Sequence, residues 1–212
     1  MAAPEPAVQV EQTAIANVLV VRPKSYHDTR GFFFESFNQD TFRAAIGRPF
    51  TAAQVNCSVS RRGVIRGVHG ARLPGQAKLV YCVRGAILDV AVDMRVGSPT
   101  FGKYVERRLS QHEPEAVFLG EGIGHGFQIL EDDTCVNYLC SAPYVPGDEI
   151  ALDPLDPEVN IAWRATEPLV LSDKDRTARM LSQLLADGEL PAYEECLRFQ
   201  GTGRDFAGAD GR

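Results

Sequence analysis

The sequence predicts an all-β protein, either a sandwich or a barrel of short strands. Residues 16–170 carry short apolar runs rich in Val, Ile, Phe and Tyr, and clusters of Gly, Pro, Asn or Asp interrupt them about every eight to twelve residues. The chain has 212 residues, 44% of them apolar, which is enough to bury a core of its own. No repeat or long linker divides it, so we expect a single domain over residues 1–212.

The strands of this domain are expected wherever an apolar run lies between two turn signals. The runs that meet this condition are 17–26, 31–37, 78–85, 86–95, 104–110, 116–120, 125–130 and 134–141. Residues 86–95 alternate, so that Asp89 and Asp93 share one face of the strand. Such a face could bind a ligand inside a barrel mouth, but the simpler interpretation is that both carboxylates face water.

A few segments have helical rather than strand patterns. A short helix is expected over 39–47, ending at Gly47. From Ser172 a capping residue precedes apolar positions at helical spacing before Gly188, which predicts an amphipathic helix. After Pro191 we expect another turn or two of helix over 192–199, and a loose end over 200–212. The core thus covers about 16–175 and the C-terminal helical extension about 176–200.

Composition excludes several classes of partner. The net charge of −6 argues against nucleic-acid binding, because a duplex needs a basic face. No apolar run approaches the length that crosses a bilayer, and the N-terminal residues do not resemble a secretory signal, so a cytoplasmic location is expected. The cysteines have no CxxC spacing and are interpreted as buried reduced thiols: Cys57, Cys82, Cys135, Cys140 and Cys196.

Two of the four histidines lie between glycines, His69 in "RGVHG" and His125 in "GIGHGF". Glycine permits sharp turns and the close approach of a substrate. Histidines on a β-barrel can instead hold a metal, but Gly70 and Ala71 follow His69, so the HxH pair typical of metal-binding cupins is missing. No zinc-like spacing of nitrogen and sulfur ligands occurs either, and we therefore expect no metal.

Without a metal, His69 could act as a general base that removes a carbon-bound proton. Such a base needs a carboxylate to orient it, a cation to stabilise the enolate, and an acid on the opposite face. Spacing alone does not choose among the candidates. They are Asp89, Asp93, Asp173 and Asp175 for the carboxylate, Arg66, Lys78 and Arg84 for the cation, and Tyr138 for the acid.

Taken together and in order, several segments resemble one family, the dTDP-4-dehydro-6-deoxyhexose epimerases. The resemblance runs over about residues 17–180 and rests on the ordered set rather than on any one segment. The matching segments are "DTRGFFFESF" (28–37), "QVNCSVSRRGVIRGVH" (54–69), "QAKLVYCVRGAILDVAVDMRVGSPTFG" (76–102), "GIGHGF" (122–127), "YLCSAPYVPGDE" (138–149), "DPLDPEVNIAW" (153–163) and "LSDKD" (171–175).

This resemblance implies a cupin-like double-stranded β-helix, or jelly roll, that works as a homodimer on a dTDP-sugar without a cofactor. By position, His69 resembles the family's base and Asp175 its carboxylate partner. Lys78 resembles the lysine near the sugar C4 oxygen, where a cation favours the enolate. Tyr138 resembles the tyrosine that returns a proton from the other face and so inverts the carbon.

The resemblance also implies a set of residues that line the nucleotide-sugar site. A guanidinium such as that of Arg66 suits a diphosphate, because it can bind two oxygens at once. An acidic protein can therefore bind an anionic ligand through a local cation. The implied binding residues are Arg30, Glu35, Gln54, Asn56, Arg66, Asp89 and His125.

The chain departs from the family pattern beside the base and in its tail. The family commonly has an aromatic and then a polar residue after this histidine, whereas Gly70 and Ala71 stand here, so a smaller wall is expected beside His69. The tail resembles that of epimerases from antibiotic deoxysugar pathways, some of which invert only one carbon.

The resulting hypothesis is cofactor-independent epimerisation of a dTDP-4-keto-6-deoxyhexose at C3, C5 or both. The alternatives are a monoepimerase of the same family, a metal-dependent cupin enzyme, and a sugar-nucleotide binding module without catalysis. The last is disfavoured because binding alone needs neither a base nor an opposed acid.

Overall fold

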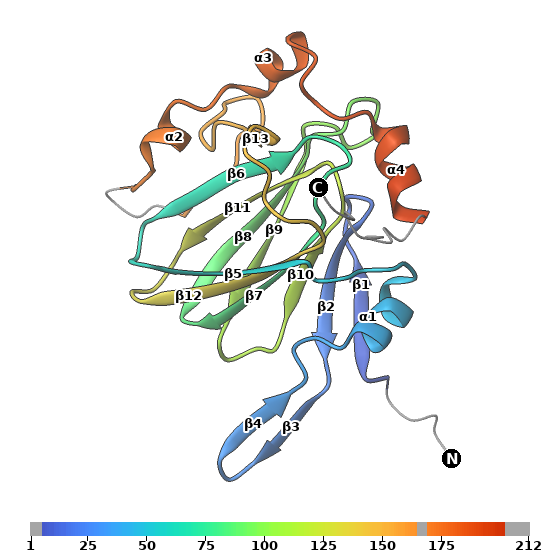
Figure 1. Ribbon diagram of the computed structural model, residues 1–212. Coiled ribbons are helices and arrows are strands. Elements are labelled where there is room, and N and C mark those ends of the chain that lie inside the picture. Colours follow the sequence, from blue (N-terminus) through green and yellow to red (C-terminus); the bar gives the residue numbers. More distant parts are fainter. Residues whose placement is uncertain (1–5, 165–168, 202–212) are drawn as a thin grey trace, which may run out of the picture.

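The expected all-β architecture is confirmed by the computed structural model, which describes residues 6–164 and 169–201. Two antiparallel sheets face one another as a sandwich (Figure 1). The larger sheet has the order β1-β2-β10-β7-β12-β5. Its strands are β1 (Val8–Gln12), β2 (Val18–Pro23), β10 (Ala116–Leu119), β7 (Lys78–Arg84), β12 (Thr134–Cys140) and β5 (Gln54–Ser60).

The smaller sheet has the order β13-β6-β11-β8-β9, and a separate hairpin completes the strand set. The sheet is built from β13 (Glu149–Ala151), β6 (Ile65–Ala71), β11 (Ile123–Ile129), β8 (Ala86–Asp93) and β9 (Tyr104–Ser110). The hairpin consists of β3 (Ser25–Asp28) and β4 (Gly31–Phe34), and it projects from the sandwich (Figure 1).

The main core lies between the two sheets and consists of aliphatic side chains with Phe127 and Cys82. A second cluster covers the outer face of the smaller sheet, where Leu88, Val90 and Val92 of β8 pack against the C-terminal segment. Both faces of β8 are therefore covered, and all of its residues are buried. The expectation that Asp89 and Asp93 face water is wrong for this reason, since they are only 2% and 0% exposed.

The two carboxylates of β8 have different partners. Asp93 accepts two hydrogen bonds from the Arg95 guanidinium, at 2.7 and 2.8 Å, and further ones from Ser98 and Thr100. Burial alone would raise the pKa of Asp93, but these hydrogen bonds outweigh it and lower that pKa. Asp93 is thus a structural group, whereas Asp89 contacts a histidine near the pocket described below.

The first helix matches its prediction, whereas the helix predicted after Ser172 does not. In α1 (Gln39–Ile46), Asn38 caps the start, and Gly47 ends the helix at φ 72°. The single helix expected after Ser172 is instead α2 (Asp173–Arg176) followed by α3 (Leu181–Ala186). The Thr177 hydroxyl donates to carbonyls of α2, and Arg179 forms a β-bridge with Leu152, which diverts the chain.

The last helix, α4 (Tyr193–Gly201), agrees with the short helix expected after Pro191. Most of the loose end expected over 200–212 lies outside the described residues. The cysteine expectation is correct in part, because Cys57 is exposed and Cys135 partly buried, while all five thiols are free. Among the described residues, no helix is long and apolar enough to span a membrane.

Candidate active site

A pocket of about 350 Å³ opens between the two sheets. His69 enters it from β6 in the smaller sheet, whereas Lys78 and Tyr138 enter from β7 and β12 in the larger one. Groups from the two sheets therefore face a common space from different sides. Its lining consists of Gln54, Asn56, His69, Gly70, Ala71, Arg72, Pro74, Gly75, Gln76, Lys78, Tyr138, Ala142, Pro143, Tyr144, Val145, Asp148 and Glu149.

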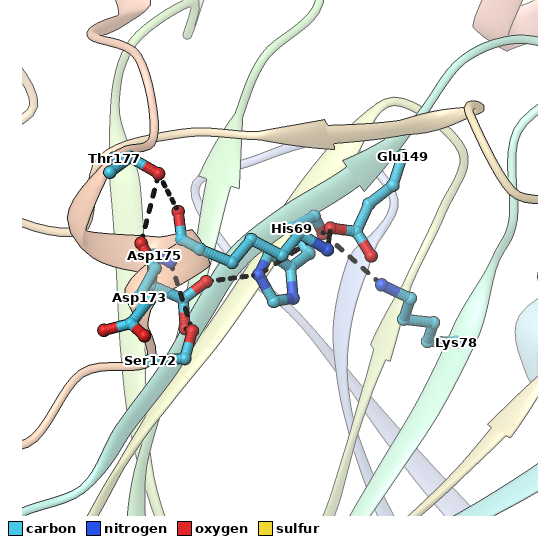
Figure 2. Close-up of polar contacts among 8 residues, drawn as sticks. His69, Lys78, Glu149, Ser172, Asp173, Asp175 and Thr177 are labelled. Atoms are coloured by element: carbon cyan, nitrogen blue, oxygen red, sulfur yellow. Dashed lines mark hydrogen bonds and ion pairs between the residues drawn. The ribbon is translucent and has the colours of Figure 1, made fainter.

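The His69 ring is held by a carboxylate far along the chain. Its Nε2 lies 2.7 Å from Oδ1 of Asp175, a residue 106 positions later (Figure 2). A carboxylate only accepts hydrogen bonds, so Nε2 carries the proton and donates it. The other ring nitrogen, Nδ1, then keeps its lone pair, and His69 can accept a proton there.

Asp175 is fixed in turn by the first turn of α2. Ser172 caps this helix, because its Oγ accepts from the Asp175 backbone N–H at 3.1 Å. The same hydroxyl donates to Asp175 Oδ2 at 2.8 Å. Burial alone would raise the pKa of Asp175, but the hydrogen bonds from His69 and Ser172 lower it below its usual value. The carboxylate is therefore charged at neutral pH and orients the imidazole.

Lys78 lies on the opposite side of the His69 ring from Asp175 (Figure 2). Its Nζ donates to the backbone carbonyl of His69 at 3.4 Å, and the residue is only 9% exposed. Burial lowers the pKa of this ammonium, although the nearby Cys140, Glu149 and Asp89 oppose that shift. A buried ammonium with a lowered pKa is a good hydrogen-bond and proton donor to a developing oxyanion.

Tyr138 faces the pocket from the larger sheet. It pairs with Asn56 of β5 in the strand register, and its ring meets the His125 ring edge-on, with centroids 6.5 Å apart. Burial raises the pKa of Tyr138, so the phenol keeps its proton at neutral pH. It can therefore act as an acid opposite a histidine base.

Several charged residues of the site were missed by the sequence reasoning: Arg72, Asp148 and Glu149 line the pocket, and Lys174 contacts Glu149. Glu149 lines the pocket, with Oε1 3.8 Å from His69 Nε2, and it forms an ion pair with Lys174 of α2. The contact from Glu149 raises the pKa of Lys174. A signal was present, because Glu149 ends the matching segment 138–149 and Lys174 lies inside "LSDKD".

The predicted binding residues divide into two groups. Gln54 and Asn56 line the pocket and are joined by a 2.8 Å hydrogen bond. The others do not line it. Arg66 is exposed on β6 and donates to Ser60 Oγ at 3.0 Å.

His125 and Asp89 form a second buried pair behind the pocket. His125 is the register partner of His69 on the neighbouring strand, and its Nε2 lies 2.8 Å from Asp89 Oδ1. By contrast, Arg30 is exposed beside the projecting hairpin, where it pairs with Asp28, and Glu35 follows the hairpin. Within one chain, Arg30 and Glu35 are therefore not brought to the pocket.

A smaller pocket wall beside His69 was expected from both Gly70 and Ala71, but the two residues face opposite sides of β6. A Cβ at Gly70 would point away from the pocket, lying 3.4 Å from Met94 Sδ and 3.9 Å from Ile150 Cβ in the outer core. Successive residues of a strand face opposite sides, so Ala71 shares the pocket side with His69. The short side chain that shapes the pocket is therefore Ala71, not Gly70.

The described residues offer no candidate ligand set for a metal ion. In that part of the chain, no three His, Cys, Asp or Glu side chains gather closely enough to hold one. His69 in the pocket and His125 behind it each direct a ring nitrogen to a single aspartate instead. The arrangement is that of an orienting carboxylate and a base.

Comparison with known proteins agrees with this geometry. A family model described as dTDP-4-dehydrorhamnose 3,5-epimerase matches residues 12–183. The chain belongs to this epimerase family. It is an isomerase of the epimerase type, as expected from the ordered segments. An epimerase structure from Mycobacterium tuberculosis superposes with a TM-score of 0.89 at 39% identity, covering 92% of this chain and 100% of that one, which confirms the cupin-like fold.

Two relatives of equal identity differ in the reaction that their names describe. A dTDP-4-dehydrorhamnose 3,5-epimerase from Mycolicibacterium smegmatis is 45% identical over 89% of this chain and 93% of its own length. A dTDP-4-dehydrorhamnose 3-epimerase from Streptomyces niveus is also 45% identical, over 89% of this chain and 91% of its own. Overall identity therefore does not distinguish one inverted carbon from two.

Proposed function

We propose that the protein epimerises a dTDP-4-keto-6-deoxyhexose at C3 and C5, without a metal or other cofactor. The observation that carries this proposal is the placement of His69 and Tyr138 on opposite sheets around one pocket that Lys78 also lines. Inversion of a carbon needs a proton to leave from one face and return to the other, and this arrangement supplies both groups.

In the first step, Nδ1 of His69 removes the proton on a carbon next to the C4 ketone. The electron pair of the C–H bond forms the enolate, and its charge develops on the C4 oxygen. Lys78 stabilises that oxygen by donating a hydrogen bond in a buried setting, where such a bond is strong. Asp175 stabilises the imidazolium that forms, since it accepts from Nε2.

In the second step, the Tyr138 hydroxyl donates its proton to the opposite face of the enolate carbon. The carbonyl at C4 re-forms, and the carbon has the inverted configuration. The tyrosinate regains a proton from water through the pocket mouth, and the His69 imidazolium releases the proton that it removed to water, which restores both groups. The raised pKa of Tyr138 suits this role, because the phenol enters each cycle protonated.

The remaining predicted residues bind the substrate in this proposal. Gln54 and Asn56 offer amide groups to the sugar from the larger sheet. Arg66 binds the diphosphate, and the Asp89–His125 pair supports Tyr138 from behind. At the pocket rim, the exposed Tyr144 presents a ring face on which the base of the nucleotide can stack.

We further propose that the active form is a homodimer in which Arg30 and Glu35 of one subunit complete the site of the other. Two observations support it. The hairpin β3–β4 projects with Tyr26 and Phe33 exposed by 58% and 68%. Strand β5 also turns its polar residues inward and its apolar residues outward, and this pattern suits a sheet whose outer face is covered.

A complementation experiment tests the dimer. A variant with Arg30→Ala and a variant with His69→Asn should each be inactive, whereas a refolded mixture should recover about a quarter of the wild-type activity, because one mixed site is intact. No recovery in the mixture would contradict the shared site.

A cytoplasmic location also belongs to this proposal, since five free thiols suit a reducing compartment.

Proton exchange tests the reaction itself. The 4-keto sugar nucleotide, incubated with the protein in deuterated water, should gain deuterium at C3 and C5. His69→Asn should lower the exchange rate about 10²–10⁴-fold, the range for a general base, while His112→Asn on the exposed surface should leave it unchanged. Absence of label at both carbons with the wild-type protein would refute the proposed function.

Inversion at C3 alone is the second candidate, because a 3-epimerase is among the 45%-identical relatives. The same experiment separates the two. Label confined to C3, with C5 unlabelled after many turnovers, would identify a monoepimerase and leave the roles of His69 and Lys78 intact.

A further inference from the structure

One carboxylate of the C-terminal extension forms ion pairs with two arginines beside the active-site segments. Glu189, which follows α3, accepts from Arg72 Nη2 at 2.5 Å through Oε2. Its Oε1 lies 2.5 Å from Arg179 Nη2. Hydrogen bonds from Arg179, and with them the charge of both arginines, hold the pKa of Glu189 below its usual value. Glu189 thus bridges two arginines that are far apart in sequence.

These two arginines flank the catalytic pair. Arg72 lies three residues after His69, and Arg179 lies four residues after Asp175. The Arg72 backbone N–H donates to the Asp148 carbonyl at 2.8 Å, which fixes the end of β6 against β13. The Arg179 backbone carbonyl accepts from Asp153 at 2.9 Å, just after β13. The bridge therefore spans the same two segments that His69 and Asp175 join.

Helix α2 needs such support because it has only four residues. One turn of helix has little stability of its own and depends on tertiary contacts. Ser172 fixes the start of α2, while the β-bridge between Arg179 and Leu152 fixes the segment that follows α2. A shift of this segment would lengthen the 2.7 Å contact between Asp175 and His69 directly.

We propose that Glu189 is a positioning residue for the His69–Asp175 pair and acts through Arg72 and Arg179. The expected effect of Glu189 on kcat rests on the proposed function. Its expected effect on the exchange of the His69 Nε2–H with water does not. The C-terminal extension is thereby part of the active-site support rather than an appendage.

The test compares Glu189→Gln with Asp187→Asn. Both remove one acid from the same segment. Among the residues that the structure describes, Asp187 pairs with Arg179, at 2.8 Å, whereas Glu189 pairs with both Arg179 and Arg72. In Glu189→Gln, kcat for deuterium exchange should fall about fivefold to tenfold, because small displacements at a reacting group are costly, while the Kd for dTDP stays unchanged. Asp187→Asn should keep the wild-type kcat.

Coupling and spectroscopy separate positioning from general stability. Arg72→Gln should lower kcat as Glu189→Gln does, and the double variant should be no worse than the poorer single variant. In proton NMR, the His69 Nε2–H should exchange with water faster in both single variants and not in Asp187→Asn. Unchanged imidazole exchange in Glu189→Gln, or an equal loss of kcat in Asp187→Asn, would overturn the proposal. If wild-type protein shows no deuterium exchange, the proposed reaction fails while the NMR comparison still decides this inference.

Discussion

Replacement of Asp175 by Asn tests the catalytic pair most directly. The carboxylate accepts from His69 Nε2 at 2.7 Å and from Ser172 Oγ at 2.8 Å. An Asn side chain of nearly the same shape has one oxygen and one NH₂ group. If the NH₂ group faces His69, it donates to Nε2 and forces the ring proton onto Nδ1. The lone pair that accepts the substrate proton is then lost.

The expected loss follows from these contacts. A hydrogen bond to a charged group contributes about 1.5–3 kcal/mol, which corresponds to roughly 10–150-fold in rate. The wrong tautomer adds to this, so kcat for deuterium exchange should fall about 10²–10⁴-fold. The Kd for dTDP should change little, because Asp175 lies behind His69 and does not line the pocket.

The matched control is Asp173→Asn in the same turn of α2. Asp173 is exposed, and its side chain has no described contact with His69. Both variants are assayed for deuterium uptake under single-turnover conditions with excess enzyme. If Asp175→Asn retains kcat within threefold of the wild type, the assignment of Asp175 as the orienting carboxylate is wrong.

Three further outcomes are expected. Tyr138→Phe should still exchange the substrate proton for deuterium through His69, but the rate of net inversion should fall about 10²-fold or more. NMR spectra should therefore show deuterium label without formation of the epimer. Normal inversion would exclude Tyr138 as the acid. Gly70→Ala should leave kcat unchanged, since the added Cβ would make ordinary contacts with Met94, and the Tm should stay the same or rise slightly. A tenfold loss of kcat would instead place Gly70 against the substrate. Asp93→Asn should destabilise by about 3–5 kcal/mol at pH 7, because Arg95 is left buried without its counter-charge. The lowered pKa of Asp93 contributes stability that is fully present above the unfolded pKa of about 3.9 and is lost as pH falls through the folded pKa. In urea titrations the two proteins should therefore begin to converge near pH 4 and coincide only below the folded pKa.

The parts of the fold that could be predicted are those in which local pattern and burial agree. The runs 78–85 and 134–141 became β7 and β12 because their apolar content matches strands at the centre of a sheet. Gly47 ended α1 as expected, since a left-handed cap favours glycine. The pairing of His69 with Asp175 followed from family resemblance alone, because no spacing rule connects residues 106 positions apart.

Two of the strands that the pattern missed, β5 and β6, have identifiable physical reasons. In β5, Gln54 and Asn56 face inward to the pocket while Val55 and Val59 face outward, so apolar residues do not mark the buried side. Strand β6 was missed because glycines interrupt its apolar residues. The break between α2 and α3 depends on the bridge from Arg179 to Leu152, a tertiary contact that overrides helical periodicity.

The placement of the proposed base and acid, His69 and Tyr138, on separate sheets has a consequence for how the reaction could diversify. Facing sheets lie about 10 Å apart and change that spacing little, because their cores are close-packed. The two proton-transfer groups are therefore fixed, and a sugar ring in the gap meets them according to how far it slides along the strands. Side chains of the pocket lining, such as Ala71 and Tyr144, would limit that sliding. Regiochemistry can then evolve by changing one of these side chains, with the catalytic groups untouched.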